Sequence, residues 1–278
     1  MKKKILFYGN CQMGAVSKYF RLKMSDEFDV QLCTDCGLEL FWNEPSLFAV
    51  WSSENKKNQE FYKDCVHSKI KEADVFVFQD HSGLSAIDEL KTTYLHDTIA
   101  TGLKVCIPDI RIFCHLTEDR QLEPFIKYAK TKTNSAEEII NFLQKSEDPE
   151  LVAILKNEYP FNLNYKWYTN ENKQRYEQEI ELYDNRIDMC DYVEREFQKK
   201  LLCVTHNHMN ECYFVELIGR LYKLLDIDSS VYPITNVEFP KHNSIDPRQF
   251  TFFTKTFPDL DYGNFKGRDL KATDLLSL

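Results

Sequence analysis

The sequence predicts an α/β protein with an open, mainly parallel five-stranded sheet in three layers and a large helical insertion. Short apolar runs alternate with amphipathic helical patterns, which is the order expected when right-handed crossovers join parallel strands. The chain has 278 residues, of which 43% are hydrophobic and 28% charged, as in an ordinary globular protein. A chain of this length buries about 75% of its unfolded surface, so its core needs neither disulfides nor metal.

Five apolar runs predict the strands. They are rich in Val, Ile, Leu and Phe and show little polar alternation, which is typical of strands covered on both faces of a sheet. The runs are residues 4–8 (KILFY), 29–33 (DVQLC), 74–78 (DVFVF), 104–107 (KVCI) and 201–205 (LLCVT).

Helical spacing of apolar residues fills the intervals between the first four strands. Residues 12–24, 61–70 and 85–99 each place apolar side chains three and four positions apart. Ser85 and Asp88 resemble a capping box at the start of the third of these segments.

Residues 117–200 predict a helical insertion between the fourth and fifth strands. Ser135 and Glu138 again resemble a capping box, and residues 171–200 carry one apolar seam that predicts a long amphipathic helix. We expect residues 1–278 to form a single α/β domain, with the insertion covering the end of the sheet that carries the site.

Charge and hydropathy exclude several classes of protein. Lys and Arg number 35 against 44 Asp and Glu, so the net charge of −9 argues against a nucleic-acid binder. No apolar run reaches the ~20 residues of a membrane span, and the apolar stretch near the N-terminus is too short for a signal peptide. We therefore expect a cytoplasmic protein whose nine cysteines are mostly reduced.

Polar residues follow four of the predicted strands directly. In an open parallel sheet, ligands bind beyond the carboxyl ends of the strands, so these four tips are expected to converge. They are Gly9-Asn10-Cys11-Gln12, Gln79-Asp80-His81-Ser82-Gly83, Pro108-Asp109-Ile110-Arg111 and His206-Asn207-His208-Met209-Asn210.

The first tip carries the strongest signal. Gly9 permits a tight turn from strand to helix, and Cys11 would begin the helix, where the dipole stabilises a thiolate. The amides of Asn10 and Gln12, with backbone N–H groups, could donate to a developing oxyanion. A small buried thiol in a tight turn is the structural alternative. The P-loop lysine and the Gly-rich dinucleotide motif are both missing from this tip.

The fifth tip supplies a candidate general base. His206 and His208 alternate, so both point to one side of an extended chain, and a histidine takes protons near neutral pH. The pair could instead ligate a metal, but no further ligand has fitting spacing, so we expect no metal. Asn210 is a natural N-cap for the next helix. At the third tip His81 is open to a structural or a functional role.

The GNCQ tip and the late Asn207-His208 pair resemble the WcbI-type polysaccharide biosynthesis proteins. Met209 stands where that family commonly has proline. The resemblance implies an acetyltransferase that uses acetyl-coenzyme A to O-acetylate a saccharide, on a flavodoxin-like or distantly SGNH-esterase-like fold. Carried over, Cys11 matches the nucleophile and His208 the late histidine. The esterases' Asp before the histidine is missing, so a Cys–His dyad and a direct transfer past Cys11 both stay open.

Three functions are therefore expected to compete. The first is the acetyl-coenzyme A-dependent O-acetyltransferase, with a glycan acceptor and with Gly9, Lys18, Arg21, Arg111 and His206 as cofactor contacts. The second is an SGNH-like esterase that removes acyl groups from a sugar or lipid, and the third is a non-catalytic binding protein on the same fold. The sequence leaves the oligomeric state open.

Overall fold

The computed structural model describes most of the predicted sheet and its helices. The described residues are 2–9, 11–34, 56–80, 88–108, 123–145, 148–151, 153, 183, 185–205, 208–234, 259 and 261. The chain divides into two compact units. The first comprises Met1–Ile110, Asn170–Cys190 and Phe214–Phe239, and the second Arg111–Thr169, Asp191–Tyr213 and Pro240–Leu278.

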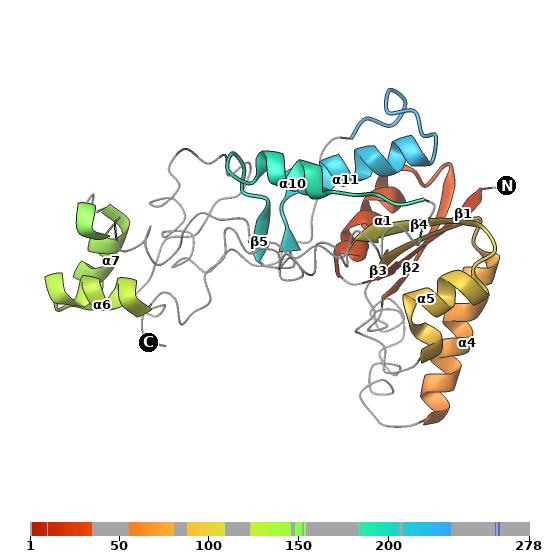
Figure 1. Ribbon diagram of the computed structural model, residues 1–278, viewed down its shortest axis with the longest axis horizontal. Coiled ribbons are helices and arrows are strands. Elements are labelled where there is room, and N and C mark those ends of the chain that lie inside the picture. The colour runs from red at the N-terminus through yellow and green to blue at the C-terminus, as the bar shows by residue number, and fades with distance from the viewer. Residues whose placement is uncertain are drawn as a thin grey trace. The chain divides into compact units, whose positions relative to one another are not determined.

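The first unit is built on a four-stranded parallel sheet (Figure 1). Its strands are β1 (Lys3–Gly9), β2 (Phe28–Thr34), β3 (Val75–Asp80) and β4 (Leu103–Pro108), in the order β2-β1-β3-β4. Four of the five predicted strands and the parallel, open α/β class are thereby confirmed. The chain turns one way from β1 to β2 and the other way from β3 to β4, so the strand order reverses between β1 and β3.

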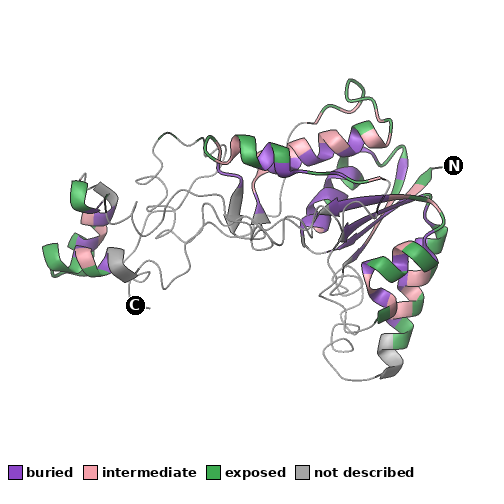
Figure 2. Cartoon of the chain, viewed as in Figure 1, coloured by how far each residue is buried: buried purple, intermediate pink, exposed green. Residues whose placement is uncertain are grey.

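Both faces of the central strands are buried, as the purple strands of Figure 2 show. One face packs against α4 (Lys56–Glu72) and a broken helical segment of η1 (Asp88–Leu90), α5 (Thr92–Tyr94) and η2 (Leu95–Ile99). The helix predicted over 85–99 is thus present as three short pieces. Ser85, which would complete its capping box, lies outside the described residues.

The other face of the sheet packs against α1 (Cys11–Lys23), which in turn contacts α11 (Glu211–Leu224). Phe20 of α1 lies with its ring centroid 5.2 Å from that of Phe7 in β1 and 5.9 Å from that of Tyr222 in α11. Helices therefore lie on both faces of the sheet in this unit.

Residues 185–187 extend the sheet beyond β4. Arg186 forms a parallel bridge with Cys106, whose N–H donates to Asn185 O at 2.8 Å and whose carbonyl accepts from Ile187 N–H at 2.9 Å. The prediction of one long helix over 171–200 is wrong. The described residues of this span are extended as far as Met189, and α10 covers only Cys190–Glu196.

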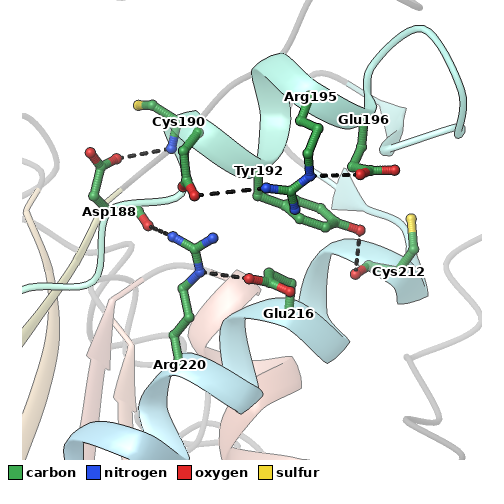
Figure 3. A network of polar contacts seen from close by, with 9 residues as sticks. Asp188, Cys190, Tyr192, Arg195, Glu196, Cys212, Glu216 and Arg220 are labelled. Atoms are coloured by element: carbon green, nitrogen blue, oxygen red, sulfur yellow. Dashed lines mark hydrogen bonds and ion pairs between the residues drawn. The ribbon is translucent and has the colours of Figure 1, made fainter.

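An arginine ties this extended segment to α11. Arg220 donates to the carbonyl oxygen of Asp188 at 2.5 Å and to Glu216 Oε1 at 2.8 Å (Figure 3). The bond to a backbone oxygen fixes the segment independently of its side chains.

Two helices lie in the described part of the segment predicted as an insertion. They are α6 (Glu123–Lys132) and α7 (Ala136–Lys145). Glu138 N–H donates to Ser135 Oγ at 3.1 Å and Ser135 N–H to Glu138 Oε2 at 3.4 Å, so the predicted capping box is confirmed.

The predicted fifth strand belongs to a different sheet. β5 (Cys203–Thr205) pairs antiparallel with β6 (His208–Met209) in a two-stranded sheet of the second unit. The prediction of a fifth strand in the main sheet is therefore wrong. A run of three to five apolar residues satisfies a small hairpin as well as a central strand, because both need burial and neither imposes a distinctive period.

Membrane topology adds one finding. Within the described part of the chain, no helix is long and apolar enough to cross a bilayer.

Candidate functional site

The reversal of strand order marks the candidate site. Gly9 ends β1 and Asp80 ends β3, and the register that pairs Tyr8 with Phe78 puts Gly9 beside Gln79. Open α/β sheets bind ligands at this switch point, in the crevice outside the carboxyl ends of the strands.

Gly9 cannot be replaced by a larger residue without rearrangement. Its φ of 157° is one that L side chains rarely adopt. A Cβ atom built on it would lie 2.5 Å from Gln79 Oε1 and 2.6 Å from Met13 Cγ. Glycine is therefore required here for two reasons: its backbone angle, and the lack of space for a Cβ beside Gln79 and Met13.

Two glutamine amides meet behind this turn. Gln79 Nε2 donates to Gln12 Oε1 at 3.1 Å, although the residues are 67 positions apart. Gln79 is fully buried and Gln12 is only 2% exposed. Burying an amide without a partner costs about 1–3 kcal/mol, so the pair is stable only as a bonded unit.

Cys11 is the first residue of α1, immediately after this turn. The first turn of α1 contains no acidic residue that would oppose a negative charge. Unsatisfied N–H groups and the helix dipole favour an anion at such a position. The structure describes the backbone of Cys11, while its side chain lies outside the described atoms.

The late histidine is described at the level of the backbone. His208 lies in β6, where it pairs with Thr205. Asn210 follows and confirms its predicted role as N-cap, because its Oδ1 accepts from Glu211 N–H at 2.8 Å while its Nδ2 donates to Leu201 O at 2.8 Å. Both ends of the β5–β6 hairpin are thereby tied together.

Several predicted site residues lie outside the described part of the chain. They are Asn10, His81, Arg111, His206 and Asn207. Their roles, like those of the Cys11 and His208 side chains, stay predictions.

The two cations predicted on α1 lie at different distances from the turn. Lys18 is exposed, about 10 Å along the helix axis from Cys11 at 1.5 Å per residue. Arg21 is about 15 Å away by the same rise. It donates to Val30 O at 3.3 Å and lines a surface pocket with Lys2 and Lys4 at the amino ends of the strands. Arg21 thus lies at the edge of the sheet opposite Gly9.

Gln79 was predicted at the third tip but was assigned no role in the site. Its signal was present, because Gln79 is an amide that directly follows the four apolar residues Val75–Phe78 of β3. What the sequence could not supply was its partner, since a hydrogen bond across 67 residues depends on the strand order.

No metal centre emerges from the described residues. Among them no three His, Cys, Asp or Glu side chains are grouped so as to hold an ion.

Comparisons with known proteins place the fold. No protein-family model matches the sequence, and no curated protein matches it. The chain is similar to the solved structure of WcbI, described as a novel polysaccharide biosynthesis enzyme, in a native form without a disulfide bond between coenzyme A and one of its cysteines. The TM-score is 0.53 at 14% identity, over 99% of this chain and 87% of that one. The resemblance expected from the GNCQ tip is thus confirmed as a likeness of fold.

Proposed function

We propose that this chain is an acetyl-coenzyme A-dependent O-acetyltransferase that acts on a saccharide. One observation carries the proposal: the glycine turn at the switch point delivers Cys11 to the first position of α1. The fold is shared with an enzyme of polysaccharide biosynthesis whose structure is described by reference to coenzyme A and a cysteine. Both features fit a thiol that meets a thioester substrate.

The proposed reaction has two steps. The proposed base His208 holds the proton of Cys11, and the Cys11 thiolate attacks the acetyl carbonyl of acetyl-coenzyme A. The thioester bond to coenzyme A breaks, and coenzyme A leaves as a thiol by taking that proton from His208. A saccharide hydroxyl then attacks the acetyl-Cys11 thioester, gives its proton to His208 and leaves Cys11 as thiolate. Exchange between two thioesters is nearly balanced, and transfer to the oxygen makes the second step downhill.

The chain's other residues have supporting roles in this proposal. Backbone N–H groups at the start of α1, with the side-chain amides of Asn10 or Gln12, would donate to the oxyanion in each step. His208 is the base that the sequence resemblance implies. Lys18 and Arg111 are the proposed phosphate contacts. Arg21 is left out, because it lies at the opposite edge of the sheet from Gly9.

Calorimetry with coenzyme A is the first test. We expect wild-type protein to bind coenzyme A, and Cys11→Ser to keep binding while losing acetyl transfer to a saccharide mixture. Cys65→Ser, a cysteine of α4 on the other face of the sheet, is the matched control and should behave as wild type. Absence of binding at millimolar coenzyme A would refute the proposal.

Trapping separates the two-step route from its rivals. Acid quenching after mixing with acetyl-coenzyme A should leave an acetyl group on the Cys11 peptide in mass spectrometry, and His208→Ala should let it accumulate. Direct transfer predicts turnover without this adduct. An esterase predicts release of p-nitrophenol from p-nitrophenyl acetate without coenzyme A, and loss of that release in Cys11→Ala.

A further inference from the structure

We propose that Gln79 is a positioning residue that holds Gly9 and Gln12, which flank Asn10 and Cys11 in the sequence, and thereby sets the reactivity of the Cys11 thiol. The inference rests on the proposed function only for the role of Cys11 as nucleophile. The positioning of Gly9 and Gln12 by Gln79 is argued from contacts between described residues of β1, α1 and β3.

The first contact is on the helix side of the turn. Gln79 Nε2 donates to Gln12 Oε1 at 3.1 Å, and both side chains are buried. Water cannot replace the bond without entering the core, so the position of Gln12 follows that of Gln79. Gln12 is the residue that directly follows Cys11 in the first turn of α1.

The second contact is on the strand side. The Cβ that Gly9 lacks would lie 2.5 Å from Gln79 Oε1 and 3.1 Å from Gln79 Cβ. The Gln79 side chain therefore rests directly against the backbone of Gly9. Gly9 and Gln12 enclose the Asn10–Cys11 dipeptide, so one side chain fixes the chain on both sides of it.

The support for Gln79 is itself rigid. In β3 it lies beside Ile107 of β4, and the four residues before it in β3 are buried. Gln79 is anchored on a central strand of the sheet, so its position is fixed by the core. Gln79 thus holds the start of α1 against the sheet. A reactive thiol needs such a rigid support to keep its position.

Nothing in core packing requires an amide at this place. A leucine or methionine would fill a similar volume at the end of β3 without the cost of burying an amide. The amide is useful only to a partner, and Gln12 accepts one hydrogen bond from it. This is the pattern expected when a buried polar pair specifies one geometry.

The test compares the pH dependence of Cys11 alkylation by iodoacetamide, with the site assigned by mass spectrometry. Gln79→Met keeps the length of the side chain and removes the donor. We expect the pH midpoint of Cys11 alkylation to rise and the rate at neutral pH to fall about tenfold, the effect of one pKa unit on the thiolate fraction. Gln12→Met should give the same shift, and the double variant no further one, because all three lack the same bond.

Thr92→Val is the matched control. Thr92 is also a buried polar residue of the first unit, but it lies in α5, on the other face of the sheet. It should lower the melting temperature without moving the Cys11 profile. If Gln79→Met likewise lowers only the melting temperature, Gln79 is structural and the proposal is overturned. Should Gln79→Met fail to fold, Gln12→Met alone decides.

The two proposals fail in different ways. If wild-type protein binds no coenzyme A, the proposed function is lost, whereas the alkylation profiles still report whether Gln79 sets the Cys11 thiol. If coenzyme A binds and the profiles of Gln79→Met and wild type coincide, the function stands and the positioning role is wrong.

Discussion

The hydroxyl of Tyr222 in α11 donates a hydrogen bond to the hydroxyl of Tyr19 in α1 at 3.2 Å. The two rings lie 6.4 Å apart, and Tyr19 donates onward to Pro233 O at 3.5 Å. Both side chains are buried. These hydrogen-bonded phenols link α1, which begins at Cys11, to α11. Their loss should therefore loosen the packing on the face of the sheet that carries the proposed nucleophile.

Tyr222→Phe tests this link. It removes the donor and leaves the Tyr19 oxygen with one fewer partner in a buried place, so we expect a loss of about 1 kcal/mol in the free energy of unfolding, within a range of about 0.5–1.5. Urea unfolding measures it. Tyr94→Phe is the control, since Tyr94 is 36% exposed and its change should lie within about 0.5 kcal/mol of zero. Equal losses in the two variants would contradict the prediction.

Alkaline pH should weaken the fold through the same residue. Burial, with the hydrogen bond to Tyr19, raises the pKa of Tyr222 well above its ordinary value. In the unfolded chain the phenol ionises at about pH 10, whereas in the folded chain it stays neutral. The stabilisation is therefore fully present below about pH 10 and declines as the pH rises above it.

Urea midpoints measured from pH 8 to pH 11.5 check this dependence. We expect the wild-type midpoint to be steady at first and to fall above about pH 10. Tyr222→Phe should start lower and fall less steeply, since it has lost the titrating group. Parallel curves for the two proteins would show that other groups cause the alkaline loss.

The main sheet was predictable because its strands are buried on both faces. Runs such as residues 74–78 have no polar alternation, and only a covered strand tolerates that. Residues 185–189, before α10, were predicted as helix although their burial alternates as in a strand. Ile187 and Met189 are buried while Arg186 and Asp188 are less so, an alternation of period two. Tyr183, Ile187 and Cys190 are spaced four and then three positions apart, and this spacing suggested a helix instead.

The site was predictable in its parts and not in its connections. The sequence placed Gly9 and Cys11 at a strand end, because glycine and a polar run after a buried strand indicate a turn there. It could not show that Gln79 contacts both Gly9 and Gln12, because this contact follows from β3 lying beside β1. Strand order depends on how whole helices pack, and no local pattern encodes it.

Gly9→Ala should destabilise the protein strongly. The new Cβ would meet Gln79 Oε1 and Met13 Cγ at 2.5 and 2.6 Å, and the backbone φ of 157° is unfavourable for alanine. Overpacking of a tight core site costs about 1–3 kcal/mol, so we expect a loss in the upper part of that range. Thermal unfolding measures it, together with loss of coenzyme A binding.

Gly14→Ala is the matched control for Gly9→Ala. Gly14 lies inside α1, and the nearest atom to an added Cβ is Leu32 Cδ2 at 4.0 Å. Alanine is favoured over glycine within a helix by about 0.5–1 kcal/mol, so this variant should be more stable than wild type. Destabilisation by both substitutions would mean that α1 as a whole, and not the turn, is sensitive to added volume.

Ser135→Ala should loosen α7 in the second unit. It removes the side chain that accepts from Glu138 N–H at 3.1 Å, and loss of an N-cap costs about 1 kcal/mol of helix stability. The hydrogen bonds from Ser135 also lower the pKa of Glu138, its backbone N–H being the larger cause. The carboxylate's contribution is therefore present above the ordinary Glu pKa and declines as the pH falls through the folded value.

Hydrogen exchange of the α7 amides measures both effects. At pH 7, Ser135→Ala should speed exchange in the first turn of α7 by about fivefold, the factor that corresponds to about 1 kcal/mol, and leave the amides of β1 and β3 unchanged. Ser135→Thr keeps the accepting hydroxyl and is expected to retain most of the protection. Lowering the pH below the ordinary Glu pKa should reduce α7 protection in both proteins, because the backbone N–H of residue 135 remains in Ser135→Ala. Equal protection in wild type and Ser135→Ala would show that the hairpin of α6 and α7 is held by its apolar contacts alone, among them Ile139 and Leu143.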